Sequence, residues 1–176
     1  MIEQKICQGR DMSLPSTMTT EYESPVSHAI NAYFSSRSLC SGSMICDLIS
    51  HITGSVVGMN GVSGPFSPDN IVYCKSKYLF IKRHMDPGKV KGMIEEFEAE
   101  HGYFPRVILE EGGGLTVVDE NEKLVKIVRD VYLDMMKISY LSRQFGGPHL
   151  MTPDQVNYIK DWEVERYRRK VAKGGQ

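Results

Sequence analysis

Three consecutive glycines separate two apolar segments that have the composition of β-strands. The stretch spans residues 106–118 and reads RVILEEGGGLTVV. Apolar β-type runs around a glycine cluster predict a hairpin, because glycine adopts turn conformations that are closed to residues with a Cβ. The amide groups of such a turn can also face an anion. The candidate ligand-binding residues are therefore Gly112, Gly113 and Gly114, and the candidate catalytic bases beside them are Glu110 and Glu111.

The size and charge of the chain indicate one ordinary globular domain. It has 176 residues, of which 41% are hydrophobic and 24% are charged, with a formal net charge of -1. These values favour neither nucleic acid nor membrane as a partner. No basic segment precedes an apolar run near the N-terminus, and no stretch approaches the roughly 20 apolar residues that span a bilayer. We expect a cytoplasmic protein.

Cysteine and histidine spacing offers no metal motif. The four cysteines contain no Cys-x-x-Cys pair, and we expect them to be reduced thiols. The five histidines show no His-x-His or His-Glu-x-x-His spacing. We therefore assign no metal ligands from the sequence, although distant residues can still assemble a site.

The N-terminal part divides into an arm and the start of a folded domain. Residues 1–22 show no sustained hydrophobic period and are interpreted as an arm or connector. The folded domain is placed at 23–170, followed by a flexible tail at 171–176. Ser24 and Pro25 supply an N-cap and a first-turn proline, so a helix is predicted to begin here and to end near residue 35.

Two segments follow in which helix and strand are hard to separate. Ser43 is interpreted as the cap of a helix over residues 44–52, with a buried strand as the alternative. The preceding Ser-Gly-Ser can also hold an anion, but capping is the preferred interpretation. Residues 55–59 are predicted as a short strand that the Asn60-Gly61 turn closes.

A loop with two prolines occupies residues 63–69. Proline restricts the backbone and removes amide donors, so the loop should have a defined shape. Its candidate ligand-binding residues are Ser63, Gly64 and Ser67.

Two strands are predicted next, at residues 71–74 and 78–81, and Lys75 and Lys77 lie between them. Lysines at the tip of a hairpin are usually solvated, and attraction of a phosphate is the alternative. After the second predicted strand, the sequence again shows the patterns that predict helices.

Three helices are predicted in the remainder. Asp86 and Pro87 begin a helix that Gly102 ends, with its glutamates on a solvated face. A long amphipathic helix is predicted over about 120–145. A last helix begins at Thr152-Pro153, where Gln155 completes a capping box.

The glycine run does not match the known glycine motifs. A phosphate-binding P-loop needs Gly-Lys-Ser/Thr and then a helix, whereas a strand follows here. A dinucleotide fingerprint fails for the same reason, and no Gly-x-Ser-x-Gly nucleophile elbow occurs. The glycine turn is therefore not expected to be a P-loop, a dinucleotide-binding loop or a nucleophile elbow.

Three stretches together resemble the class II aldolase (AraD/fuculose-phosphate aldolase-like) family, in particular the second, repeat-like segment of its long bacterial members. Residues 66–73, FSPDNIVY, are similar to the family segment T-P-D-x-[IV]-[IV]. Residues 104–115, FPRVILEEGGGL, are similar to P-[KR]-V-[IV]-L-x-x-G-x-G-L. Residues 162–168, WEVERYR, are similar to the family ending W-E-V-E-x-Y-R. With the intervening helix, the resemblance covers more than half of the chain.

The resemblance implies a three-layer α/β/α domain with a mixed, largely antiparallel sheet. Active members bind a divalent metal, usually zinc, through a His-x-His pair and a third histidine in an Asn-His-Gly-Leu segment on a hairpin. If that hairpin corresponds to this one, Asn and His fall on Gly112 and Gly113, while Gly114-Leu115 keep the Gly-Leu. Since glycine has no side chain to donate and the His-x-His pair is absent, neither part of the metal centre carries over.

The function that we expect is a class II aldolase-like domain of carbohydrate metabolism that serves assembly or sugar-phosphate binding. Its expected partners are a second copy of the chain or an upstream aldolase domain, and a sugar phosphate. The alternative is an active sugar-phosphate aldolase or epimerase, a carbon–carbon lyase with zinc, whose site another chain or domain completes. A ligand sensor without catalysis is a third hypothesis. No cofactor is expected outside the zinc of the alternative.

Overall fold

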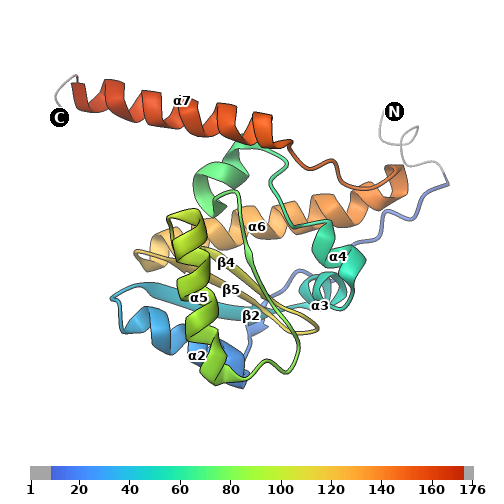
Figure 1. Ribbon diagram of the computed structural model, residues 1–176. Coiled ribbons are helices and arrows are strands. Elements are labelled where there is room, and N and C mark those ends of the chain that lie inside the picture. The colour runs from blue at the N-terminus through green and yellow to red at the C-terminus, as the bar shows by residue number, and fades with distance from the viewer. Residues whose placement is uncertain (1–8, 173–176) are drawn as a thin grey trace.

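A five-stranded mixed sheet forms the centre of the computed structural model, which describes the backbone of residues 9–172 and the side chains of residues 9–162 (Figure 1). The strands are β1 (Thr20–Glu21), β2 (Cys40–Ile45), β3 (Leu79–Ile81), β4 (Val107–Glu110) and β5 (Leu115–Asp119). The helices are α2 (Pro25–Ser35), α3 (Asp47–Thr53), α4 (Val56–Asn60), the π-helix η1 (Asn70–Cys74), α5 (Pro87–His101), α6 (Glu122–Ser142), the 3-10 helix η2 (Arg143–Phe145) and α7 (Pro153–Ala172).

The strand order is β1-β2-β5-β4-β3, and only β3 and β4 of these five strands run parallel. Leu115 of β5 is opposite Met44 of β2 and Leu109 of β4. The parallel pair is connected by α5, since parallel neighbours need a crossover. The hairpin that the glycine run predicts is confirmed as β4 and β5.

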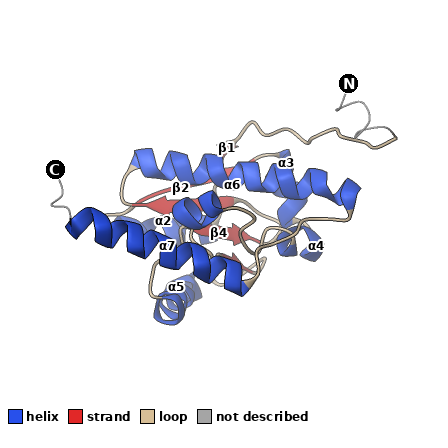
Figure 2. Ribbon diagram, turned by 90° about the horizontal axis from the view of Figure 1, so that it is seen from above, coloured by secondary structure: helices blue, strands red, loops and turns tan. Residues whose placement is uncertain are grey.

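Helices cover both faces of the sheet (Figure 2). Neighbouring residues of a strand point to opposite faces. Leu109 accordingly packs with α3 and α6, whereas Ile108 packs with α2 and α5. The predicted three-layer α/β/α domain with a mixed, largely antiparallel sheet is therefore confirmed. Helix α7 lies outside these layers and packs against η1 (Figure 1).

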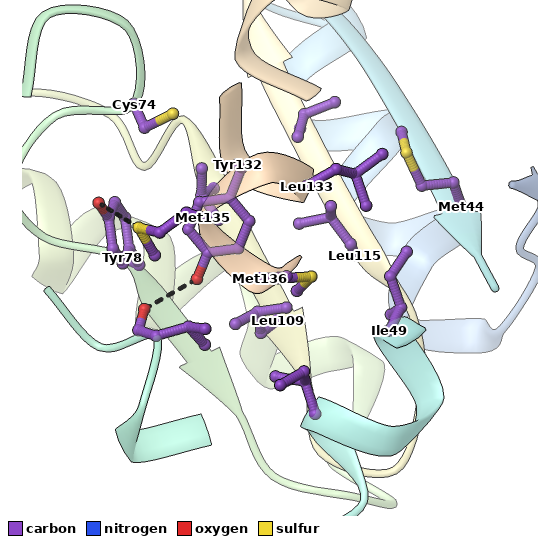
Figure 3. Packing of buried hydrophobic residues seen from close by; sticks show 14 of the residues in the cluster. Met44, Ile49, Cys74, Tyr78, Leu109, Leu115, Tyr132, Leu133, Met135 and Met136 are labelled. Carbon is purple, nitrogen blue, oxygen red and sulfur yellow. Dashed lines mark hydrogen bonds between the residues drawn. The ribbon is translucent and has the colours of Figure 1, made fainter. Parts of the chain in front are cut away.

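The core between the sheet and α6 fixes the loop that carries Ser63. The Tyr132 hydroxyl on α6 donates a hydrogen bond to the Val62 carbonyl at 3.0 Å (Figure 3). Burial raises the pKa of Tyr132 well above its usual value, so the hydroxyl keeps its proton and remains a donor. The neighbouring Tyr78 hydroxyl contacts Met135 Sδ at 3.8 Å. Long helix α6 thus holds the start of the 63–69 loop in place.

The helix predicted over residues 44–52 is wrong in its first part, where the structure has strand β2 followed by α3. The polar Ser-Gly-Ser resembles a cap in sequence, yet its hydroxyls are used inside the fold. Ser41 Oγ donates to Asn31 Oδ1 on α2 at 2.7 Å, and Ser43 Oγ lies 2.8 Å from Thr116 Oγ1 on β5. These contacts across elements stabilise a polar strand, and the strand alternative holds for residues 44 and 45.

Two further predicted strands are wrong. Residues 55–59 lie mostly in α4, because Ser55 Oγ accepts the Gly58 amide as an N-cap at 3.0 Å. Residues 71–74 lie in η1, which begins at Asn70. The buried Asn70 Oδ1 accepts the Phe66 and Ser67 amides at 3.0 and 3.2 Å, so the chain turns where a strand was expected.

The other helices are confirmed with their caps. Ser24 Oγ accepts the Ser27 amide at 2.9 Å, and Thr152 Oγ1 accepts the Gln155 amide at 3.3 Å. Residues 1–8 of the predicted arm, the side chains of the W-E-V-E-x-Y-R segment from residue 163 onward, and residues 173–176 of the predicted tail lie outside the described residues.

Three of the four cysteines, Cys40, Cys46 and Cys74, are described, and all three are free thiols. In the described part of the chain, no helix combines the length and the apolar character that crossing a bilayer requires.

Candidate functional site

The glycine turn uses its own amide groups to hold the fold together. The Gly112 amide donates to the Thr53 carbonyl at 2.8 Å, and the Gly113 amide donates to the Glu110 carbonyl at 2.9 Å. In return, Thr53 Oγ1 donates to the Gly113 carbonyl at 2.9 Å. Gly112 has φ +65°, a conformation that favours glycine. Two of the three amides proposed for an anion are thus bonded to protein carbonyls.

Tyr22 lies directly against the other two glycines, both of which are buried. A Cβ on Gly114 would approach Tyr22 Cδ1 to 2.4 Å, and a Cβ on Gly113 would approach the Tyr22 hydroxyl to 2.5 Å. The glycines are therefore required by the close approach of this ring. Tyr22 belongs to the segment predicted as an arm, which in the structure joins the sheet through β1.

Glu110 is held by two hydroxyl groups from the same N-terminal segment. Its Oε2 accepts hydrogen bonds from Ser24 Oγ at 2.9 Å and from the Tyr22 hydroxyl at 3.2 Å. Burial raises the pKa of Tyr22, and the nearby Glu110 carboxylate raises it further. The tyrosine therefore stays protonated and donates to the carboxylate. Glu110 connects the hairpin to the start of α2.

Glu111 faces a different environment, a cavity of about 340 Å³ that we call the Glu111 cavity. The carboxylate accepts one long hydrogen bond, from the Arg83 amide at 3.3 Å. The residues that line the cavity come from α4, the loop after it, β3 and the glycine turn: Val56, Met59, Asn60, Ser63, Phe80, Ile81, Lys82 and Glu111. The two candidate bases therefore do not converge on one point.

The candidate residues of the proline loop are divided among cavities. Ser63 lines the Glu111 cavity and also a second cavity of about 290 Å³, which Gly64 and Ser76 line as well and which we call the Ser76 cavity. Ser67 lines neither; it lies beside Asn70, with its Oγ donating to Asn70 Oδ1 at 3.2 Å. Of the predicted site residues, Ser63 and Glu111 are the two that share the Glu111 cavity.

The residues at the turn do not fit the metal centre of active aldolases. Among the described residues, no three His, Cys, Asp or Glu side chains are grouped so that they could hold a metal ion. A histidine at Gly113 would meet the Tyr22 hydroxyl and the Glu110 side chain with its Cβ alone. At Gly112 the left-handed backbone disfavours any residue with a Cβ. The turn therefore has no space for a histidine at the position where the resemblance would place the third ligand.

Three residues of these surroundings carry no signal of a binding site in the sequence. Asn60 is predicted as a turn residue, Lys82 follows a short strand, and Tyr22 lies in an aperiodic segment. Their positions depend on packing between segments that are distant in the chain. Tyr22 could be identified only from a predicted contact between residues 22 and 113, and no rule of sequence spacing predicts a contact over that separation.

No protein-family model and no curated protein matches the sequence. The structure is similar to a solved one, an aldolase II superfamily protein from Pseudomonas syringae, with a TM-score of 0.54 and 10% sequence identity. The similarity covers 85% of this chain and 60% of that one. It shows that the chain has a fold of the aldolase II type, over somewhat more than half the length of that protein.

Proposed function

We propose that the chain is an aldolase II-like module of carbohydrate metabolism that binds a sugar phosphate in the Glu111 cavity without a metal centre. The observation that carries the proposal is that Ser63 and Glu111, from segments far apart in the sequence, line the same cavity. The class of ligand comes from the motif resemblance to class II aldolases, and the likeness to an aldolase II superfamily protein supports the fold on which it rests.

The lining of the Glu111 cavity suits a small polyhydroxylated ligand. Met59 and Phe80 offer apolar surface to the carbon skeleton, while Ser63 and Glu111 offer hydrogen-bond partners to hydroxyl groups. Lys82 is exposed and forms no ion pair with the described residues, so its ammonium group is available to a phosphate. Each part of a sugar phosphate thus has a matching group.

Binding without turnover follows from the chemistry of carbon–carbon cleavage. That reaction needs an electrophile that polarises the carbonyl group and stabilises the enediolate. Glu111 supplies at most a base, and Glu110 is bonded to Tyr22 and Ser24. We therefore assign the module to ligand binding and subunit assembly.

An active enzyme completed by another chain or domain is the alternative function. The chain spans 60% of the aldolase II structure, which supports a second copy or an upstream aldolase domain as the partner. Tyr158 and Trp162 of α7 are 71% and 55% exposed and lie four residues apart, on one side of the helix. We assign this side of α7 to the contact with such a partner.

A thermal-shift panel of pentose and hexose phosphates tests the proposal. At about ten times Kd, a ligand stabilises the fold by about 1.4 kcal/mol, which raises the Tm of a chain of this size by about 3–5 °C. Lys82→Gln and Glu111→Gln should each abolish the shift, whereas the controls Lys126→Gln and Glu120→Gln should keep it. A flat response across the panel contradicts ligand binding. About one equivalent of tightly bound zinc in the purified chain supports the alternative.

A further inference from the structure

Among the residues that the structure describes, the Ser76 cavity carries positive charge without an acidic counterpart. Lys77 and Lys160 line it, and none of its described lining residues is an aspartate or a glutamate. Neither lysine forms an ion pair with any residue that the structure describes. Two like charges that line one cavity repel each other, and an anion between them offsets that repulsion. The charge pattern therefore selects a negatively charged ligand.

Ser76 provides a second, independent observation. It lines the cavity, only 3% of its surface is exposed, and its hydroxyl has no hydrogen-bond partner among the described residues. A buried hydroxyl without a partner is uncommon in native proteins and indicates a missing water, ion or ligand. An anion bound by the two lysines would supply the acceptor that this hydroxyl lacks.

The first two turns of α7 form one wall of the Ser76 cavity. The residues concerned are Pro153, Val156, Asn157 and Lys160, whose spacing places them on one face of the helix. The N-terminal end of a long helix carries partial positive charge. The side-chain amide of Asn157 adds a hydrogen-bond donor to this wall.

We propose that the Ser76 cavity is a binding site for a small tetrahedral anion, either free phosphate or the phosphoryl group of a monoester. Lys77 and Lys160 provide the charge, and Ser76 and Asn157 provide neutral hydrogen bonds. The inference goes beyond the sugar-phosphate proposal, because the Ser76 and Glu111 cavities share only Ser63 among the described residues that line them.

Amide NMR spectra of the full chain, titrated with inorganic phosphate at constant ionic strength, test this site. Signals of residues 76–78 and 157–160 should shift in a saturable manner. Lys77→Gln together with Lys160→Gln should weaken binding by about tenfold or more, because both charge-assisted contacts are lost. Lys77→Arg with Lys160→Arg should keep binding. Lys123→Gln with Lys126→Gln, which removes equal charge from the exposed surface of α6, is the matched control.

The site is supported by saturable shifts that are lost when Lys77 and Lys160 are both replaced by glutamine and are kept when Lys123 and Lys126 are replaced instead. Absence of shifts at these residues, or equal weakening in both pairs, overturns it. A parallel titration with methyl phosphate distinguishes the two ligand sources, since a site open to monoesters binds both probes. Lys82→Gln separates this result from the sugar-phosphate proposal, because that substitution should leave phosphate binding in the Ser76 cavity unchanged.

Discussion

Glu110 and Glu111 are adjacent in the sequence, yet they belong to regions with opposite properties. Glu110 accepts hydrogen bonds from Tyr22 and Ser24. The glycine turn that follows it is hydrogen-bonded to Thr53. By contrast, Glu111 has one long hydrogen bond and faces a cavity. The glycine run, which is the most distinctive sequence feature, therefore serves the fold, whereas Glu111 just before it lines a cavity.

This contrast has a physical origin at the end of β4. Glu110 is the last residue of this strand, whereas Glu111 belongs to the glycine turn that follows it. Glu110 reaches the N-terminal segment, where two hydroxyl groups satisfy its carboxylate, whereas Glu111 reaches the open end of β3. A glycine cluster in a sequence thus does not by itself distinguish a turn that approaches a ligand from a turn that approaches another side chain.

The strongest test of the structural side of this comparison is Gly114→Ala. The added Cβ would lie 2.4 Å from Tyr22 Cδ1 and 2.7 Å from the Met44 carbonyl oxygen. We expect the free energy of unfolding to fall by about 3 kcal/mol, as for severe overpacking. Urea denaturation monitored by circular dichroism measures the change.

Gly92→Ala is the matched control for this substitution. Gly92 lies inside α5, and a Cβ there would meet no atom within 4 Å. Alanine should stabilise the chain by about 0.5–1 kcal/mol at such a helix position. An equal, small effect at both glycines would show that Tyr22 does not pack on the turn as described.

A double-mutant cycle isolates the contact between the turn and Tyr22. Gly113→Ala places its Cβ 2.5 Å from the Tyr22 hydroxyl and should cost about 2 kcal/mol. In a Tyr22→Phe background the hydroxyl is absent, so the cost of Gly113→Ala should fall by about 1 kcal/mol. Additive effects in the unfolding free energy would exclude a direct contact between the two residues.

Sequence patterns predicted the parts of the fold whose information is local. Helices α5, α6 and α7 have amphipathic periods and caps, and the glycine run marks the β4 and β5 hairpin. Strand β2 was missed because Ser41 and Ser43 have their partners, Asn31 and Thr116, on other elements. Such a polar strand becomes favourable only when the sheet and α2 are already assembled.

The lining of the Glu111 cavity follows from the sequence only in part, for the same reason. Ser63 and Glu111 are candidates from turn and loop chemistry, and both line this cavity. Lys82 and Asn60 were missed, because the cavity forms only where α4 meets the end of β3. Conversely, the amides of Gly112 and Gly113 looked available in the sequence, yet Thr53 and Glu110 accept their hydrogen bonds.

The smallest effect on stability is expected on the cavity side of the comparison. Glu111→Gln leaves an acceptor for the Arg83 amide and keeps the shape of the side chain, so the unfolding free energy should change by less than about 0.5 kcal/mol. Lys82→Gln should be equally neutral because this exposed side chain has no ion pair with described residues. Urea midpoints of both variants check this. A loss above about 1 kcal/mol in either variant would assign that residue to the fold. For Glu111→Gln, such a loss would also remove the difference between Glu110 and Glu111.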